Sequence, residues 1–241
     1  VLGVVIMLPV TAPFARLIEQ LVPGREAALT EGLDRSLLSD PNAAMDGAGG
    51  CAARIMRAMF ASLGRCLSPG GGPLPSEDAL RLEPALDDLH AYLARIRVPA
   101  DATDAMNRYS ALLHQYDHLT RLAHRMTRED QMRPLRVDPG LRRPAMAFGA
   151  ALRRASDPDR GVQAAALERL ERLISGRTHR LRRSALLREH VGLVSVQEVF
   201  EVTDAMRWLE RAAHNAARCV HYGELALSEA PAPPVSDRLE T

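Results

Sequence analysis

Apolar residues recur at alternating spacings of three and four along most of the chain, a pattern that predicts amphipathic α-helices. Alanine, leucine and arginine are abundant, and aromatic residues make up only 4% of the sequence, which also favours helices over sheets. Two long stripes are especially regular and predict long helices with one buried face. They consist of Tyr109, Leu112, Tyr116, Leu119, Ala123 and Met126, and of Val199, Met206, Leu209, Ala213, Ala216 and Val220.

The two long helices share a sequence motif. When residues 114–128 are aligned with residues 204–218, the same residue types coincide at several positions. These are Leu119, Arg121, Ala123, His124 and Arg128 in the first copy, and Leu209, Arg211, Ala213, His214 and Arg218 in the second. An internal repeat indicates a repeated structural unit. We therefore expect two related halves.

Helix boundaries in the first half are marked by capping residues and by a glycine-rich loop. Asp40, which precedes a proline, predicts the start of a first helix. Residues 68–75 are rich in glycine and proline and predict a loop. Ser76 and Asp101 are the expected caps of a second and a third helix, and the third carries the first copy of the motif.

The second half repeats this order. Residues 129–140 are predicted to be a linker, followed by a short helix over residues 141–155 and a long helix that starts at Asp157. Ser195 and Glu198 have the spacing of a capping box, which places the start of the last helix firmly. The sequence thus predicts six helices in two sets of three, that is, two consecutive three-helix bundles.

The first residues form an uncharged, apolar segment, and the chain does not begin with Met. We interpret it as the end of a transmembrane helix, because a span needs about 20 apolar residues and because Pro9 and Pro13 are tolerated better in a membrane helix. A signal-peptide remnant and a buried core helix are the alternatives. The complete division comprises a membrane segment (1–23), a linker (24–40), a first repeat (41–128), a linker (129–140), a second repeat (141–227) and a disordered tail (228–241).

Charge and cysteine content exclude several classes of protein. The net charge of +1 argues against a general nucleic-acid binder. All the basic residues are arginines, and they crowd residues 133–188; solvated helix faces explain this best, and attraction to anionic headgroups or to phosphate is the alternative. Three cysteines without a Cys-x-x-Cys pair indicate neither a disulfide framework nor a thiolate metal site.

Several segments, taken in order, resemble a known family. Residues 119–124 and 209–214 are similar to the Leu-Glu-Arg-Ile-Gly-Asp-like sequence that closes each repeat of PhoU-like domains. The apolar start looks like the final membrane segment of bacterial sodium-coupled phosphate symporters, the type II Na/Pi cotransporter family, which carry a PhoU-like domain directly after it. The segments that carry this second resemblance are residues 2–9, 13–23, 33–41 and 204–211.

The resemblance implies the C-terminal part of such a symporter, with residues 24–241 forming a cytoplasmic, regulatory domain at the inner (plasma) membrane of a bacterium. Sodium and inorganic phosphate would be the substrates of the full-length protein, and oligomers are compatible with it. The family's Gln-Ser-rich transport hairpins are absent, so this chain alone could not transport either ion. The alternatives are a soluble PhoU-like phosphate-signalling protein and a helical interaction module without a ligand.

PhoU-like domains can hold metal clusters through a Glu/Asp-x-x-x-Asp spacing, which places two carboxylates on one helix face. Here His124 and His214 stand at the second position of that spacing, and Glu210 with His214 keeps a usable pair for a transition metal. Asp117 and Asp204 lie nearby and could add oxygen ligands. A solvated Glu/His pair is the simpler interpretation. No Walker loop, His-Glu-x-x-His motif or nucleophile elbow occurs, so we expect no catalytic residues and no enzyme.

Overall fold

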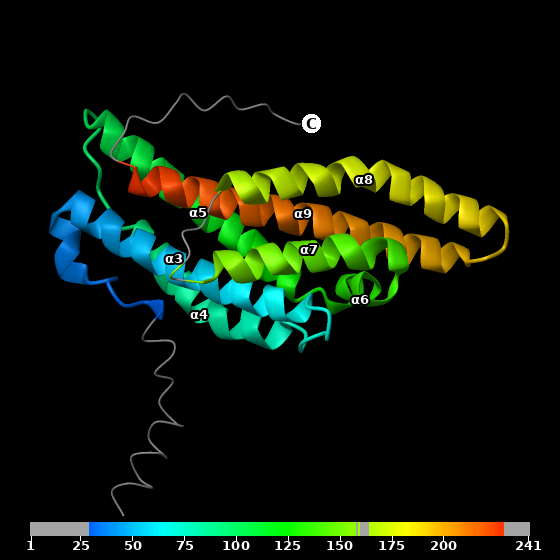
Figure 1. The fold of residues 1–241 in the computed structure, drawn as a ribbon. Helices are drawn as coiled ribbons and strands as arrows, with labels where there is room; N and C mark the ends of the chain where they lie inside the picture. Colours follow the sequence, from blue (N-terminus) through cyan, green and yellow to red (C-terminus); the bar gives the residue numbers. More distant parts are fainter. Residues whose placement is uncertain (1–28, 158, 160–163, 229–241) are drawn as a thin grey trace, which may run out of the picture.

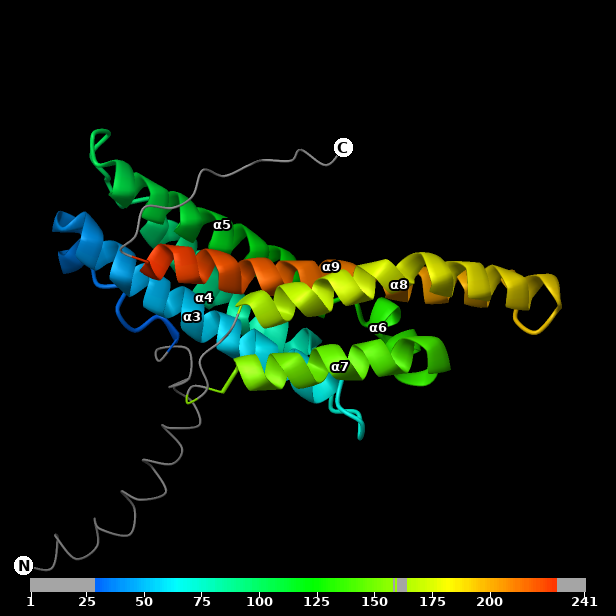
Figure 2. The ribbon, with the colours of Figure 1, turned by 45° about the horizontal axis from the view of Figure 1, so that its top comes forward.

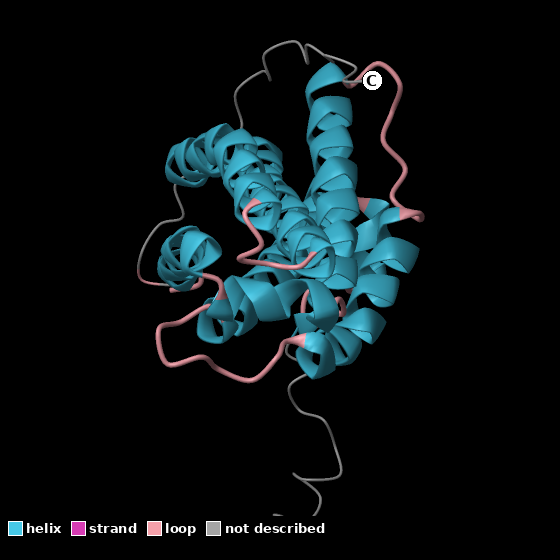
Figure 3. Ribbon diagram, turned by 90° about the vertical axis from the view of Figure 1, so that its right-hand side faces the viewer, coloured by secondary structure: helices cyan, strands magenta, loops and turns pink. Residues whose placement is uncertain are grey.

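The computed structural model describes residues 29–157, 159 and 164–228 (Figure 1). These residues form helices and connecting loops without any strand (Figure 3), so the all-α prediction is confirmed. None of the helices in the described part is both long and apolar enough to span a bilayer. The predicted membrane segment, residues 1–23, lies outside the described residues, as does the predicted tail from residue 229 onward.

The described helices follow one another with short connections, and six of them are long. In chain order they are the 3-10 helix η1 (Arg35–Ser39), α3 (Pro41–Cys66), α4 (Ser76–Leu93), α5 (Thr103–Met126), α6 (Glu129–Val137), α7 (Pro139–Ala155), α8 (Ala164–His190) and α9 (Val196–Leu227).

Two of the predicted helix caps are confirmed, and two are wrong. The Asp40 carboxylate accepts a bond from the backbone N–H of Asn42 at 2.9 Å, and Ser195 forms the complete capping box of α9. By contrast, α4 and α5 have Pro75 and Ala102 at their cap positions, without a side-chain cap bond. Ser76 lies inside α4, where its hydroxyl donates to Glu129 at the start of α6. Asp101 lies one residue too early, since Ala102 occupies the cap position of α5.

The segment over residues 129–140, expected to link the two halves, is largely helical, because most of it is helix α6. Its buried residues Met132 and Leu135 are spaced three apart, which gives this short helix an apolar face that packs against α9. Asp138 then caps α7 by accepting bonds from two backbone N–H groups. Helix α8 is described from Ala164 onward, so part of its expected start after Asp157 falls outside the described residues.

Helices α5 and α9, which carry the repeated motif, lie against each other and run antiparallel (Figure 1). Three hydrogen bonds fix their register. Trp208 donates to the Arg125 carbonyl at 2.9 Å, Gln115 to the Cys219 carbonyl at 3.2 Å, and Arg108 to the Ala226 carbonyl at 3.0 Å. In this register residue 122 of α5 lies level with residue 212 of α9, two positions that the sequence repeat matches to each other.

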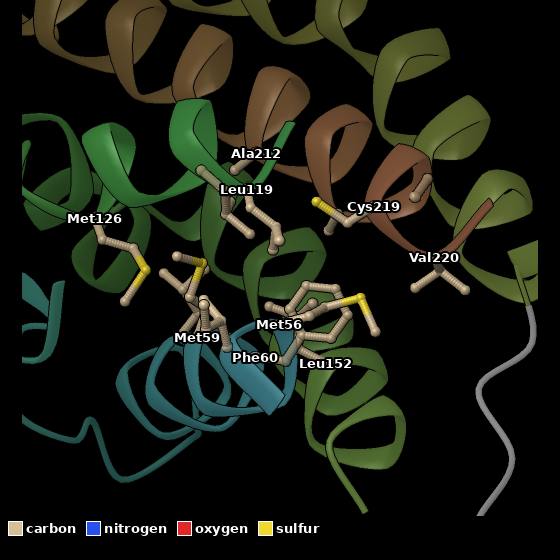
Figure 4. Packing of buried hydrophobic residues seen from close by; sticks show 14 of the residues in the cluster. Met56, Met59, Phe60, Leu119, Met126, Leu152, Ala212, Cys219 and Val220 are labelled. Carbon is tan, nitrogen blue, oxygen red and sulfur yellow. The ribbon is translucent and has the colours of Figure 1, made fainter. Parts of the chain in front are cut away.

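The core is one continuous apolar cluster that includes residues of every helix from α3 to α9. Figure 4 shows Phe60 of α3, Leu119 of α5, Leu152 of α7 and Ala212 of α9 around its centre. Helix α7 lies along α3 more than along α8, so the described residues do not confirm two separate three-helix bundles. The α3–α7 approach is close, since a Cβ atom on Gly149 would lie 2.7 Å from the Cβ atom of Leu67.

Helices α8 and α9 form a long antiparallel hairpin that projects beyond the other helices (Figures 1 and 2). The base of this hairpin packs on α5, while its tip, near residues 190–196, stands away from the α3–α5 part of the molecule. The hydrogen bonds between Glu171 and His214 and between Ser175 and Glu210 fix the register of the two helices.

Candidate functional site

Four histidines and Tyr222 gather where α5, α8 and α9 pack together. His114 and His118 lie one turn apart on α5, while His214, His221 and Tyr222 come from α9. We call these five residues the histidine cluster. The helical period brings them to one side of each helix, and the antiparallel register of α5 and α9 then brings the two sets together.

The rings of the histidine cluster contact one another in sequence. Tyr222 stacks on His114 and on His118, with ring centroids 4.8 and 5.6 Å apart, and His221 meets the Tyr222 ring edge-on at 5.3 Å. His118 in turn meets His214 edge-on at 5.8 Å. Such stacked and edge-on contacts are favourable beyond the area that they bury.

Two glutamates of α8 tie the cluster to that helix. Glu171 lies 2.8 Å from Nδ1 of His214, and Glu168 lies 3.5 Å from Nδ1 of His221. The hydrogen bond from His214 is the main reason why the pKa of Glu171 is held below its ordinary value. The Glu171–His214 pair therefore joins α8 to α9 most strongly when Glu171 is ionised.

His118 is the histidine that burial affects most. Its Nδ1 lies 3.2 Å from the side-chain oxygen of Asn215, which is itself buried. Burial lowers the pKa of His118, and the nearby His214 adds to that shift, although the bond with Asn215 opposes it. Because a charged imidazolium is poorly solvated here, the neutral form of His118 fits the site best.

The residues expected from the sequence to bind metal do not converge. Each one contacts a different neighbour: Asp117 with Arg121 at 2.9 Å, His124 with Arg128 at 3.3 Å, Asp204 with Arg207 at 3.5 Å, Glu210 with Ser175 at 2.5 Å, and His214 with Glu171. Within residues 29–228, as far as they are described, no three His, Cys, Asp or Glu side chains are arranged to hold a metal ion. The transition-metal site stays a prediction.

Sequence reasoning found His214 but missed its partner Glu171, and it missed the pair that His118 forms with Asn215. Glu171 and Asn215 could not be singled out because a glutamate or an asparagine on an amphipathic helix usually faces water. A signal did exist: histidines spaced four apart on α5, a histidine and a tyrosine in the last turns of α9, and glutamates spaced three apart at positions 168 and 171 of α8. Only the register between helices shows that these three sets meet.

The cysteines offer no reactive thiolate. All three are free and buried. Burial raises the pKa of Cys51 to about 11 and also raises the pKa of Cys66 and Cys219. A thiol with a raised pKa is a poor nucleophile at neutral pH. The charged contacts of this region are instead the Glu171–His214 and Glu168–His221 pairs.

Comparisons of the chain with protein-family models, with curated proteins and with solved structures found no match in any of the three. The class that the described residues define is an all-helical protein with a repeated helix motif and a projecting helical hairpin.

Proposed function

We propose that the chain is the C-terminal part of a bacterial sodium-dependent inorganic phosphate symporter. In this proposal residues 1–23 end the last transmembrane segment, and residues 41–227 form a cytoplasmic, PhoU-like domain that regulates transport. Helices α3–α5 and α7–α9 are the two three-helix repeats, and α6 joins them.

The observation that carries the proposal is the match between the sequence repeat and the packing of α5 on α9. Two antiparallel helices can pair in many registers, but here residues 122 and 212, which the repeat aligns with each other, lie level with each other near the middle of the two motif copies. Equivalent positions meet at the centre when two repeats are related by a local two-fold axis. This supports two copies of one ancestral unit, as the resemblance to PhoU-like domains implies.

The remaining contacts support the same relation. Helices α3 and α7, which open the two proposed repeats, lie along each other, as α5 and α9 do. Helices α4 and α8 each pack on the motif helix of their own repeat. The halves differ in detail, since α8 and α9 are longer than α4 and α5 and extend past the core.

A regulatory role fits the division of the proposed protein into a membrane part, which would transport, and a cytoplasmic helical domain. The family's transport sites lie in membrane repeats that this chain lacks, so its helical domain acts on transport from the cytoplasmic side. The Glu171–His214 pair, in which the pKa of Glu171 is held below its ordinary value, gives the domain a contact between α8 and α9 whose strength responds to pH.

The test uses the complete gene product that contains this chain, expressed in a bacterium without other phosphate importers. We expect uptake of radiolabelled phosphate that requires a sodium gradient, and a protein that stays with the membranes after a high-salt wash. Truncation after residue 40 should leave sodium-dependent uptake in place and abolish its adjustment to the phosphate supply during growth.

Two results would contradict the proposal. The full-length product could show no sodium-dependent uptake, or a high-salt wash could release it from the membranes. Release together with an altered phosphate-starvation response in a deletion strain would instead favour the soluble phosphate-signalling protein.

A further inference from the structure

The hairpin of α8 and α9 carries an unpartnered apolar groove on the side that faces away from α6. The groove is a hollow of about 210 Å³ between the two helices near the tip. We call it the hairpin groove; its lining includes Arg182, Leu186 and Glu189 of α8, and Val196, Phe200 and Arg207 of α9.

The centre of the hairpin groove exposes large apolar side chains to water. The exposed fractions are 50% for Leu186, 56% for Val196 and 66% for Phe200. The register set by the Glu171–His214 contact places Leu186 level with Phe200, so these side chains form one contiguous patch. Contiguous exposed apolar surface rimmed by polar residues marks an interaction site in soluble domains.

Along α8, a positive charge flanks this apolar patch on the side of the main body and a negative charge flanks it on the side of the tip. Arg182 lies four residues before Leu186 on the side of the main body, and Glu189 lies three residues after it on the side of the tip. Arg207 of α9 also lies on the body side, where its partner is Asp204 at 3.5 Å. Neither Arg182 nor Glu189 forms an ion pair with another described residue.

We propose that the hairpin groove binds the same groove of a second copy of this chain, with the two hairpins antiparallel and a two-fold axis close to Leu186. This arrangement places Arg182 of each copy opposite Glu189 of its partner, because the two residues lie at about 6 and 4.5 Å from Leu186 along the helix. Like charges would face each other if the hairpins were parallel. The apolar centres then cover each other, as in a four-helix bundle.

The shape of the molecule permits this contact. The hairpin projects beyond the other helices (Figure 2), so two hairpins can overlap while the bodies of the two copies lie at opposite ends. A bilayer surface fits less well, because Glu189 and Asp204 lie in the groove and would face anionic headgroups. This pairing does not depend on the proposed transport function.

Charge reversal tests the pairing directly. In sedimentation experiments on the 241-residue chain, we expect Arg182→Glu and Glu189→Arg each to weaken the dimer by about a hundredfold, because each replaces two attractive contacts by two repulsive ones. The double variant, Arg182→Glu with Glu189→Arg, should recover most of that loss. Arg180→Glu on the exposed outer side of α8 is the matched control and should have little effect.

A cysteine at the axis gives a second, independent measurement. Leu186→Cys should form a disulfide-linked dimer under mild oxidation, because the two introduced thiols would face each other across the two-fold axis. Leu173→Cys has a similarly exposed position on the same helix, 58% before substitution, and should not form one. The native cysteines are buried and do not compete.

A monomeric wild-type chain at concentrations of tens of micromolar would overturn the proposal, as would a dimer that ignores both single charge reversals. A dimer whose charge-swapped double variant stays as weak as the single variants would also overturn it, because the predicted pairs would then not exist. Loss of binding to anionic vesicles on Phe200→Ala, in a chain that remains monomeric, would assign the hairpin groove to a membrane surface instead.

Discussion

The middle and the start of helix α9 have opposite environments. In its middle and C-terminal part, residues such as Trp208 and Leu209 are almost fully buried between α5 and the other helices. Near its start, Phe200 and Val196 lie mostly in water. These exposed residues do not continue the buried stripe, whose first member, Val199, is itself buried; they belong to a second apolar face that the described residues leave uncovered.

Helices α3 and α8 differ in burial in a similar way. Helix α3 is buried along most of its length, whereas α8 has only scattered buried residues and several exposed leucines. An apolar stripe that the fold itself does not cover adds little to stability, because it gains no burial on folding. The difference separates residues that hold the fold from residues that are available to a partner.

The largest expected effect compares two aromatic residues of α9. Trp208→Ala should lower the free energy of unfolding by about 4 kcal/mol, since it leaves a cavity and removes the hydrogen bond to the Arg125 carbonyl. Phe200→Ala should change it by about 0.5 kcal/mol or less, because Phe200 is already solvated. Chemical denaturation of both variants at low protein concentration measures the difference. Similar losses for the two variants would contradict the division of α9 into a covered and an uncovered part.

The next prediction compares two glycines, one at a helix crossing and one on the hairpin. Gly149→Ala should destabilise the protein by about 2 kcal/mol, because its new Cβ atom would approach Leu67 to 2.7 Å and force α7 away from α3. Gly176→Ala should stabilise it by roughly 0.5–1 kcal/mol, since nothing lies within 4 Å and alanine favours a helix.

Thermal unfolding of these two variants at equal concentration distinguishes the two effects, which have opposite signs. The same substitution is made within a helix in both cases, so helix propensity alone predicts a gain at both positions. A gain for Gly149→Ala would mean that α3 and α7 do not approach each other as closely as described.

The sequence was enough to predict the helices but not all of their caps or their arrangement. Periodic apolar stripes located α3, α5 and α9, since only a helix presents a long period-3.6 stripe on a single face. Asp40 and Ser195 were recognisable as caps from sequence alone. Ser76 was wrongly predicted as a cap from the sequence, because its hydroxyl instead contacts Glu129 of α6, a residue far away in the sequence.

The candidate site was harder to predict, for the same reason. The histidine cluster needs the register between α5 and α9 and the placement of α8, and neither is encoded in any local pattern. The repeat makes His124 and His214 equivalent in sequence, yet the antiparallel packing gives them different neighbours, Arg128 and Glu171. A sequence repeat identifies equivalent positions, but the side chains that surround each one are set by tertiary packing.

The smallest expected effect is on how stability depends on pH, and it concerns His118, the residue of the histidine cluster whose pKa is lowered by burial. The pKa of His118 is lowered in the folded state, chiefly by burial and further by His214 and Arg121, against the opposing influence of Asn215 and Asp117. Below its ordinary value of 6.5, the unfolded chain takes up a proton at this residue more readily than the folded chain. Stability therefore falls as pH decreases through that range and is fully present above it.

Glu171 contributes in a separate window. Its pKa is lowered from 4.5 in the folded state, so its contribution is present above that value and disappears only as pH falls further. Between about pH 8 and about pH 5.5, His118→Gln should make the decline in stability shallower than in the wild-type chain, while at the upper end of this range the two proteins differ only by the lost ring contacts. Denaturation midpoints measured across this range provide the test, and parallel curves for the two proteins would show that His118 is not protonated preferentially in the unfolded state. The comparison is sharp because glutamine can still bond to Asn215 but cannot take up the proton.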